Sequence, residues 1–174
     1  IIGAMEEEVA ALKDTMEVQE TTEQASMIFC KGVLCGKEVV IVRSGIGKVN
    51  AGICAQILVD RFGVDTLINT GIAGSLDAKI DIGDMVISTD ALHHDMDATE
   101  FGYPIGQIPR MEALSFPANE ELLKKAVQAS EKANPEIHTF TGRIASGDQF
   151  IASREIKDRI VENFHPLCVE KEGA

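Results

Sequence analysis

Apolar and polar residues follow two periods along this chain, and these periods predict strands that alternate with helices. Short runs of β-branched and other apolar residues predict buried strands, because a strand covered on both faces is apolar throughout. Residues 26–43 contain two such runs joined by the sequence CGKE, which predicts an antiparallel hairpin. Apart from the first strand of this hairpin, the predicted strands lie at residues 1–2, 39–43, 66–70, 85–88, 143–146 and 167–170.

Apolar positions spaced three and four residues apart predict amphipathic helices between these strands. The predicted helices span residues 5–16, 49–62, 118–133 and 153–164. Asn119 is the expected N-cap of the third helix, whereas the capping box after Ser153 is incomplete because Ile156 occupies its third helical position. The alternation predicts an α/β fold, a three-layer sandwich with a central mixed, mostly parallel sheet flanked by helices.

Composition restricts the function more than the fold. With 174 residues, 45% of them hydrophobic, the chain suits one domain with a sizeable core. The net charge of −12 repels phosphate backbones, so we expect no nucleic-acid partner, whereas a neutral adenine-type ligand remains compatible. No apolar run has the length of a membrane span and no secretory signal is recognisable, so a cytoplasmic location is expected. Reduced cysteines, mostly in the core, fit that compartment.

The one long irregular region, residues 91–117, contains two histidines and several aspartates. Adjacent histidines on an extended segment point in opposite directions, so we expect a polar turn network and no metal site. Phe101 and Tyr103 could cover an apolar ligand or pack against a neighbour. A loop of this length in a compact domain is usually functional or interfacial.

Turns that follow predicted strands provide candidate binding chemistry. The sequences SGIGKVNA (residues 44–51) and NTGIAGSL (residues 69–76) are glycine-rich, and each is either a tight turn or a place where backbone approaches a ligand. Neither matches a dinucleotide fingerprint or a P-loop. SGDQFI follows one strand, and CVEKEGA ends another with Glu170, Lys171 and Glu172. A carboxylate there is either at an exposed strand end or suited to a ribose diol.

Three consecutive glutamates begin the first predicted helix. At about 100° per residue, Glu7 points away from the apolar stripe of that helix and towards solvent. Glu6 and Glu8 flank the stripe on its two sides. Helix geometry therefore leaves Glu6 and Glu8 as equal candidates for a functional carboxylate.

In this order the motifs IIGAMEEEV, SGIGKVNA, NTGIAGSL, HHDMDATEFGY, SGDQFI and VEKEGA closely resemble the bacterial 5′-methylthioadenosine/S-adenosylhomocysteine nucleosidases. The resemblance extends along the whole chain and implies the fold of the purine nucleoside phosphorylase-like superfamily and a homodimer. It also implies hydrolysis of the N-ribosidic bond to adenine and a 5-thioribose, without metal or organic cofactor. Such a reaction serves methionine salvage and removes a by-product of the methyl cycle.

The resemblance also assigns roles to individual residues. It implies that Glu8 activates the attacking water and that Glu172 binds the ribose. Ala73 and Gly74 match positions beside ribose and base, Phe150 and Ile151 match the adenine pocket, and Ile46 matches a contact to the 5′-thio group. Phe101 and Pro109 match residues that the dimer partner contributes to the thioalkyl pocket.

Two departures from the family pattern stand out. Lys171 occupies the position of a methionine that packs against ribose and base in the family. We also expect residues 1–174 to form a single nucleosidase domain that lacks its C-terminal portion. In the family that portion supplies the aspartate that protonates adenine N7, so the general acid is expected beyond Ala174.

Two other functions remain open from the sequence. A phosphate-dependent purine nucleoside phosphorylase needs a cationic site, for which Arg43 beside the SGIGK turn is the candidate. Glu8 argues against it, because a carboxylate facing the nucleophile repels phosphate and suits water. The other alternative is a non-catalytic nucleoside-binding protein, which the lysine at position 171 motivates.

Overall fold

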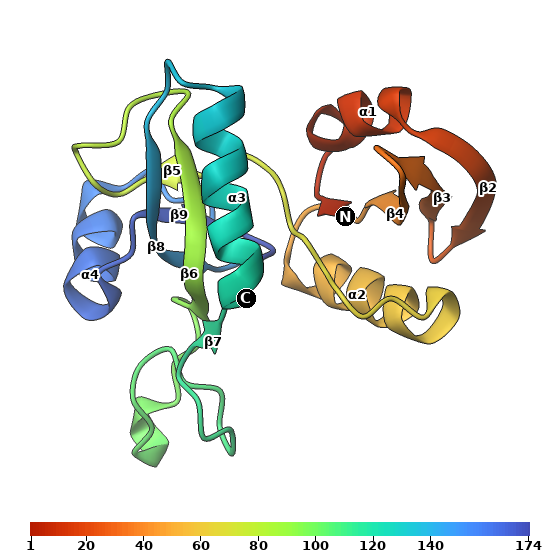
Figure 1. The fold of residues 1–174 in the computed structure, drawn as a ribbon. Helices are drawn as coiled ribbons and strands as arrows, with labels where there is room; N and C mark the ends of the chain where they lie inside the picture. The colour runs from red at the N-terminus through yellow and green to blue at the C-terminus, as the bar shows by residue number, and fades with distance from the viewer. The chain divides into compact units, whose positions relative to one another are not determined.

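A computed structural model describes residues 1–174, and contacts within the chain divide it into two compact units (Figure 1). The first unit is Ile1–Ile72 and the second is Ala73–Ala174. Each unit contains a mixed sheet covered by helices. The predicted α/β fold with mixed strand pairing flanked by helices is confirmed, and its hydrogen-bonded strands form two sheets where the prediction had one central sheet.

The sheet of the first unit has the order β1-β4-β3-β2. Its strands are β1 (Ile2–Gly3), β2 (Glu17–Gln24), β3 (Met27–Leu34) and β4 (Lys37–Arg43). β1 runs parallel to β4, and the other neighbours are antiparallel. The predicted hairpin is confirmed as β3 and β4, and its turn places Cys35 and Gly36 at φ 49° and 76°, the positive angles of a primed hairpin turn.

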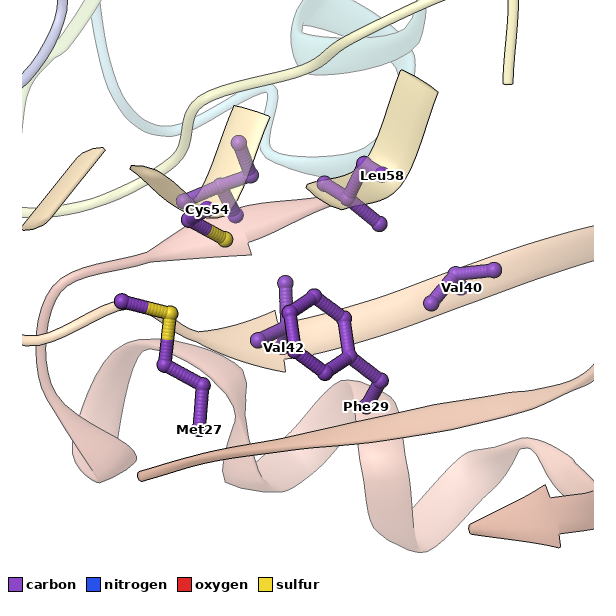
Figure 2. Packing of buried hydrophobic residues seen from close by; sticks show 7 residues of the cluster. Met27, Phe29, Val40, Val42, Cys54 and Leu58 are labelled. Carbon is purple, nitrogen blue, oxygen red and sulfur yellow. The ribbon is translucent and has the colours of Figure 1, made fainter. Parts of the chain in front are cut away.

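Two helices cover opposite faces of this sheet. Cys54 and Leu58 of α2 (Lys48–Phe62) pack against Phe29, Val40 and Val42, as Figure 2 shows. Val9 and Met16, in and just after α1 (Glu6–Thr15), lie in a separate cluster with Cys30 and Ile41. Consecutive residues of one strand thus face different helices, as the side-chain alternation of a strand requires. This explains why β4 is apolar at successive positions.

The predicted strand at residues 66–70 runs beside β1 with a single bridge, between Ile2 and Asn69. The Ile2 nitrogen donates to the Ile68 carbonyl at 2.8 Å, and the Thr70 nitrogen donates to the Ile2 carbonyl at 2.9 Å. This parallel pairing brings the glycine turn that follows Thr70 next to the start of α1.

The sheet of the second unit has the order β5-β9-β8-β6-β7. Its strands are β5 (Gly74–Ser75), β6 (Met85–His93), β7 (Phe116–Pro117), β8 (Thr139–Ser146) and β9 (Cys168–Glu170). β6, β8 and β9 are parallel and central, and the short edge strands are antiparallel. Figure 1 shows α3 (Glu120–Ala133) beside β6, and α4 (Arg154–Phe164) on the side of β8 and β9.

Capping and packing in this unit follow the sequence pattern. Asn119 Oδ1 accepts the nitrogens of Glu121 and Leu122, each at 3.0 Å, whereas the Ser153 side chain makes no cap bond. Ile160 and Phe164 of α4 pack in one buried cluster with Leu92, Ala145 and Val169.

The irregular region is shorter than the predicted 91–117, because regular structure enters it from both ends. β6 continues to His93 by resuming its parallel pairing with β8 after a register shift between Ser88 and Ala91. At the C-terminal end of the irregular region, β7 pairs with Asp90 and Ala91 of β6. Within the region, a 3₁₀ helix spans Thr99–Phe101. No helix has both the length and the apolar character needed to span a membrane.

Candidate active site

The carboxylate of Glu8 is held in place by two main-chain donors in the first unit. Its Oε2 accepts a hydrogen bond from the main-chain nitrogen of Met5 at 2.9 Å. This bond satisfies one of the unpaired donors at the start of α1. Its Oε1 accepts the nitrogen of Ile72 at 3.0 Å, from the glycine turn. A carboxylate has about four acceptor positions, so capacity remains for a water molecule.

The neighbouring glutamates have different surroundings. Glu6 pairs with Lys13 at 2.8 Å and lies 3.9 Å from Arg43 Nε, and both partners are cationic. Glu7 is exposed, as helix geometry predicts. The structure therefore separates the two candidates that the sequence left equal. Glu6 belongs to a surface ion-pair group, whereas Glu8 is partly buried and fixed by backbone.

Gly71 lets the turn approach this carboxylate closely. A Cβ atom on Gly71 would lie 2.5 Å from Glu8 Oε1, well inside van der Waals contact. Next to it lies a hollow of about 440 Å³, lined by Met5, Glu7, Glu8, Thr70, Gly71 and Ile72. The Glu8 carboxylate therefore borders a space that can hold water and part of a small molecule.

Ile46 lies in the same unit, in the SGIGK turn between β4 and α2. Gly45 and Gly47 flank it at φ 85° and 98°, which turns the chain sharply and leaves Ile46 50% exposed. The main-chain N–H of the preceding Ser44 donates a hydrogen bond to the Gly3 carbonyl oxygen, at 2.9 Å. This bond holds the turn at the carboxyl edge of β1 and β4, the edge at which α1 also begins. Ligands bind at this edge in open α/β sheets.

The second unit carries most of the other predicted residues at the carboxyl ends of its parallel strands. Lys171 and Glu172 follow β9 directly, and Gly74 pairs with Val169 of the same strand. Continuing this antiparallel register places Ala73 level with Glu170. These four predicted residues therefore gather at one edge of the second sheet.

The two predicted base-pocket residues follow β8 and have different environments. Ile151 packs against the buried cluster of Leu92, Ala145 and Val169, whereas Phe150 is 85% exposed. The sheet thus fixes Ile151 and leaves the Phe150 ring available for contact with a ligand. Phe101, which is 84% exposed, and Pro109, which is also exposed, belong to the irregular region.

The histidine- and aspartate-rich segment after β6 forms the expected polar turn network. The His94 nitrogen donates to the Ser146 carbonyl at 2.9 Å, and Asp95 Oδ2 accepts the Asp148 nitrogen at 2.8 Å. The segment is therefore tied to the SGDQFI turn. No cluster of three or more His, Cys, Asp or Glu side chains has the arrangement of a metal site.

Glu170 belongs to the strand end that the sequence indicated, but it received no role of its own there. Its carboxylate accepts hydrogen bonds from the Ser146 hydroxyl and from the nitrogens of Glu172 and Gly173. Burial, reinforced by nearby Glu172, raises the pKa of Glu170, although these hydrogen bonds act in the opposite direction. The available signal was an ionisable residue that ends an otherwise apolar buried strand.

Comparison with known proteins identifies the family. The sequence matches the family model of the phosphorylase superfamily over residues 1–174. It is 46% identical to the 5′-methylthioadenosine/S-adenosylhomocysteine nucleosidase of Staphylococcus haemolyticus (strain JCSC1435), over 99% of this chain and 75% of that protein.

Two solved structures support the same grouping. The Colwellia psychrerythraea nucleosidase in complex with adenine has a TM-score of 0.94 and 43% identity, over 99% of this chain and 71% of that one. The Neisseria meningitidis nucleosidase in complex with methylthio-immucillin-A has a TM-score of 0.93 and 36% identity, over 99% and 74%. The chain therefore belongs to the phosphorylase superfamily and, within it, to the 5′-methylthioadenosine/S-adenosylhomocysteine nucleosidases.

Proposed function

We propose that this protein hydrolyses the N-ribosidic bond of 5′-methylthioadenosine and S-adenosylhomocysteine, releasing adenine and the corresponding 5-thioribose. The observation that carries the proposal is the carboxylate of Glu8, which the Met5 and Ile72 nitrogens hold beside an open hollow. The nucleosidase relatives, one with adenine and one with methylthio-immucillin-A, support the same substrate class.

Glu8 acts as the general base in this mechanism. Water is a poor nucleophile, and a positioned carboxylate that takes its proton during attack on C1′ typically contributes about 10²- to 10⁴-fold in rate. The two main-chain donors fix the carboxylate before the substrate arrives, so little reorganisation accompanies the reaction. The sugar passes through an oxocarbenium-like state, which nearby carboxylates stabilise electrostatically.

The remaining predicted residues bind the substrate. Glu172 accepts hydrogen bonds from the ribose hydroxyls, Ala73 and Gly74 lie beside ribose and base, and Lys171 borders both. Phe150 stacks on the adenine, Ile151 supplies an apolar wall and main-chain contacts, and Ile46 contacts the 5′-thio group.

A homodimer completes the thioalkyl pocket in this proposal. Phe101 and Pro109 would each enter the pocket of the partner subunit, and the 84% exposure of Phe101 supports such a use. The enzyme acts in the cytoplasm, on a small-molecule substrate, without cofactor.

Hydrolysis fits the charges around Glu8 better than phosphorolysis does. Arg43, the one candidate for a phosphate site, lies 3.9 Å from the Glu6 carboxylate, so a competing anion already faces it. Glu8 would add a second negative charge beside an incoming phosphate. Neutral water meets no such repulsion.

The test is adenine release from methylthioadenosine by the full-length protein, measured with and without added phosphate. We expect release at the same rate in both, with free 5-methylthioribose as the second product. A requirement for phosphate would establish a phosphorylase instead. Tight binding of a substrate analogue without any turnover, unchanged in a Lys171→Met variant, would establish a nucleoside-binding protein.

A further inference from the structure

We propose that Glu170 is a positioning residue that sets the main chain of residues 171–173 and, through it, the ribose-binding carboxylate of Glu172. This inference rests on the proposed function, because it takes Glu172 to bind the ribose. It adds a residue that does not touch the substrate itself. All the contacts involved lie within the second unit.

The first contact anchors Glu170 to the sheet. Ser146 and Glu170 are register partners at the carboxyl ends of the parallel strands β8 and β9, so their side chains point to the same face. The Ser146 hydroxyl donates to Oε1 of Glu170, and Ser146 is fully buried. The main chain is tied at the same level, where the Gly147 nitrogen donates to the Glu170 carbonyl at 3.1 Å.

The other oxygen of the same carboxylate holds the segment that follows. Oε2 of Glu170 accepts the nitrogen of Glu172 at 2.8 Å and the nitrogen of Gly173 at 2.7 Å. One side chain therefore bridges the rigid end of two paired strands and the turn that carries Glu172. Bonds to an ionised acceptor are among the stronger hydrogen bonds in proteins, which suits this role.

The residue at position 173 fits the same arrangement. A Cβ atom on Gly173 would lie 3.2 Å from both carboxylate oxygens of Glu170, closer than ordinary contact. The absence of a side chain there lets the main chain close around the carboxylate. Partial burial of Glu170 is unfavourable for a charge, so its hydrogen bonds compensate for lost hydration.

The consequence is a specific one for ribose recognition. A carboxylate that accepts hydrogen bonds from a diol must have its backbone fixed, because a displacement of about 1 Å can cost about 100-fold in rate. Glu170 fixes that backbone through two consecutive turn residues. The two base-pocket residues, Phe150 and Ile151, follow β8 and lie outside this turn, and of the turn only Lys171 borders the base. Loss of Glu170 should therefore weaken recognition of the sugar more than recognition of the base.

The test compares Glu170→Ala, Glu170→Gln and Ser146→Ala with Ser130→Ala in the full-length protein. Ser130→Ala is the matched control, because its hydroxyl bonds Thr139 at 2.7 Å, at the opposite end of β8 from Ser146. Binding of adenine and of a non-hydrolysed methylthioadenosine analogue is measured by calorimetry, and kcat and KM by adenine release. The difference between the two ligands reports the ribose contribution.

We expect Glu170→Ala to lose about 100-fold in kcat/KM and in analogue affinity, with adenine affinity unchanged within about twofold. Glu170→Gln should recover most of the loss, because its carbonyl can accept both turn nitrogens and its NH₂ can donate to Ser146. Ser146→Ala should lose less than Glu170→Ala, and Ser130→Ala should match the wild type.

Equal losses for adenine and the analogue would overturn the proposal, as would a Glu170→Gln variant no better than Glu170→Ala. If Glu170→Ala does not fold, the comparison of Ser146→Ala with Ser130→Ala tests the proposal instead. Equal analogue affinity and equal kcat/KM in these two variants would overturn it. A wild-type protein that releases no adenine would refute the proposed function instead. In that case analogue binding still reports whether Glu170 positions the ribose site.

Discussion

The main-chain nitrogen of Ile72 lies 3.0 Å from Oε1 of Glu8, across 64 positions of sequence. The two residues meet because the segment before Ile72 pairs with β1, and α1 begins directly after that strand. The proposed base is therefore held by Met5, the N-cap of α1, and by the turn after residues 66–70. This relationship makes the following outcomes measurable.

Replacing Glu8 by glutamine should remove the base and keep the fold. An amide cannot take a proton from water, so kcat should fall by at least about 100-fold, the lower range for general-base catalysis. The fold and analogue binding should persist, as calorimetry can show, with a modest fall in melting temperature, because the glutamine oxygen can accept from only one of the Met5 and Ile72 nitrogens. Glu7→Gln is the control: Glu7 borders the same hollow but is exposed, and neither the Met5 nor the Ile72 nitrogen orients its carboxylate, so this variant should be nearly silent. Equal losses in both variants would contradict the assignment within the triplet.

Adding one methyl group at Gly71 should displace the same carboxylate. The new Cβ would lie 2.5 Å from Glu8 Oε1, so the base must move, and a shift of about 1 Å can cost about 100-fold in kcat. Gly52→Ala is the control, because a Cβ there meets nothing within 4 Å and Gly52 lies inside α2. It should keep full activity and gain about 0.5–1 kcal/mol in free energy of unfolding. Wild-type kcat in Gly71→Ala would show that the contact does not constrain Glu8.

The stability difference between Glu170→Gln and wild type should depend on pH with a defined sign. Burial, with help from Glu172, raises the pKa of folded Glu170 above its ordinary value of 4.5. The folded protein thus binds this proton more tightly than the unfolded chain does. The resulting stabilisation is full below about pH 4.5 and is lost as the pH rises through the folded pKa. Glutamine does not titrate, so the variant should gain in melting temperature relative to wild type as pH increases.

Melting curves between about pH 4 and pH 8 test this linkage. Glu162→Gln, an exposed glutamate of α4, is the matched control and should show a nearly constant difference from wild type. A constant difference for Glu170→Gln as well would show that its pKa is the same in the folded and unfolded protein.

Asp90 should stabilise the second unit at neutral pH through Arg143. The guanidinium donates to Asp90 Oδ2 from Nε at 2.9 Å and from Nη2 at 2.6 Å, and its Nη1 reaches the Phe164 carbonyl at 3.1 Å. Asp90→Asn should cost about 1–2 kcal/mol in free energy of unfolding, since the pair is only partly buried. The exposed pair Arg154–Asp158 provides the control, and Asp158→Asn should change stability by less than about 0.5 kcal/mol.

The same pair predicts acid sensitivity. Burial opposes ionisation of Asp90, but the hydrogen bonds and charge of Arg143 prevail and lower its pKa from 3.8. Its contribution is therefore full above about pH 3.8 and is lost as the pH falls through the folded pKa. Urea unfolding at neutral pH and near pH 3 should show a difference between wild type and Asp90→Asn that shrinks on acidification.

Lys171→Met should raise kcat. In the proposed site Lys171 borders the ribose, and a cation there would oppose the positive charge that develops on the sugar, by about 1 kcal/mol at 4 Å in water, or roughly fivefold in rate. Lys171→Gln, which is also uncharged, separates the effect of charge from that of packing. A lower kcat in both variants would show that the lysine assists the reaction.

The spacing of apolar residues predicted the helices and strands that bury an apolar face. The four helices and the buried strands follow from apolar spacing, and Val40, Ile41 and Val42 are apolar because each faces a helix. β2 was missed because its sequence, EVQETTEQ, is polar and largely exposed. It is a strand because β3 provides its hydrogen bonds, which its own side chains do not reveal.

The candidate site was predictable where chemistry is local and hidden where it depends on distant contacts. Helix geometry identified Glu7 as a solvent-facing residue, but the choice between Glu6 and Glu8 depends on Lys13, Arg43 and Ile72. Glu170 could not be distinguished from an ordinary strand end, because Ser146 lies 24 positions earlier in sequence. Only the pairing of β8 with β9 brings the two together.

Both donors to Glu8 are peptide nitrogens, and this affects how the enzyme can diverge. Side chains at Met5 and Ile72 can change without altering the bonds that orient the base, because every residue except proline offers the same N–H group. Variation in substrate preference can therefore accumulate around the hollow while the hydrolytic geometry persists. Gly71 is the exception, since any side chain there would displace the Glu8 carboxylate.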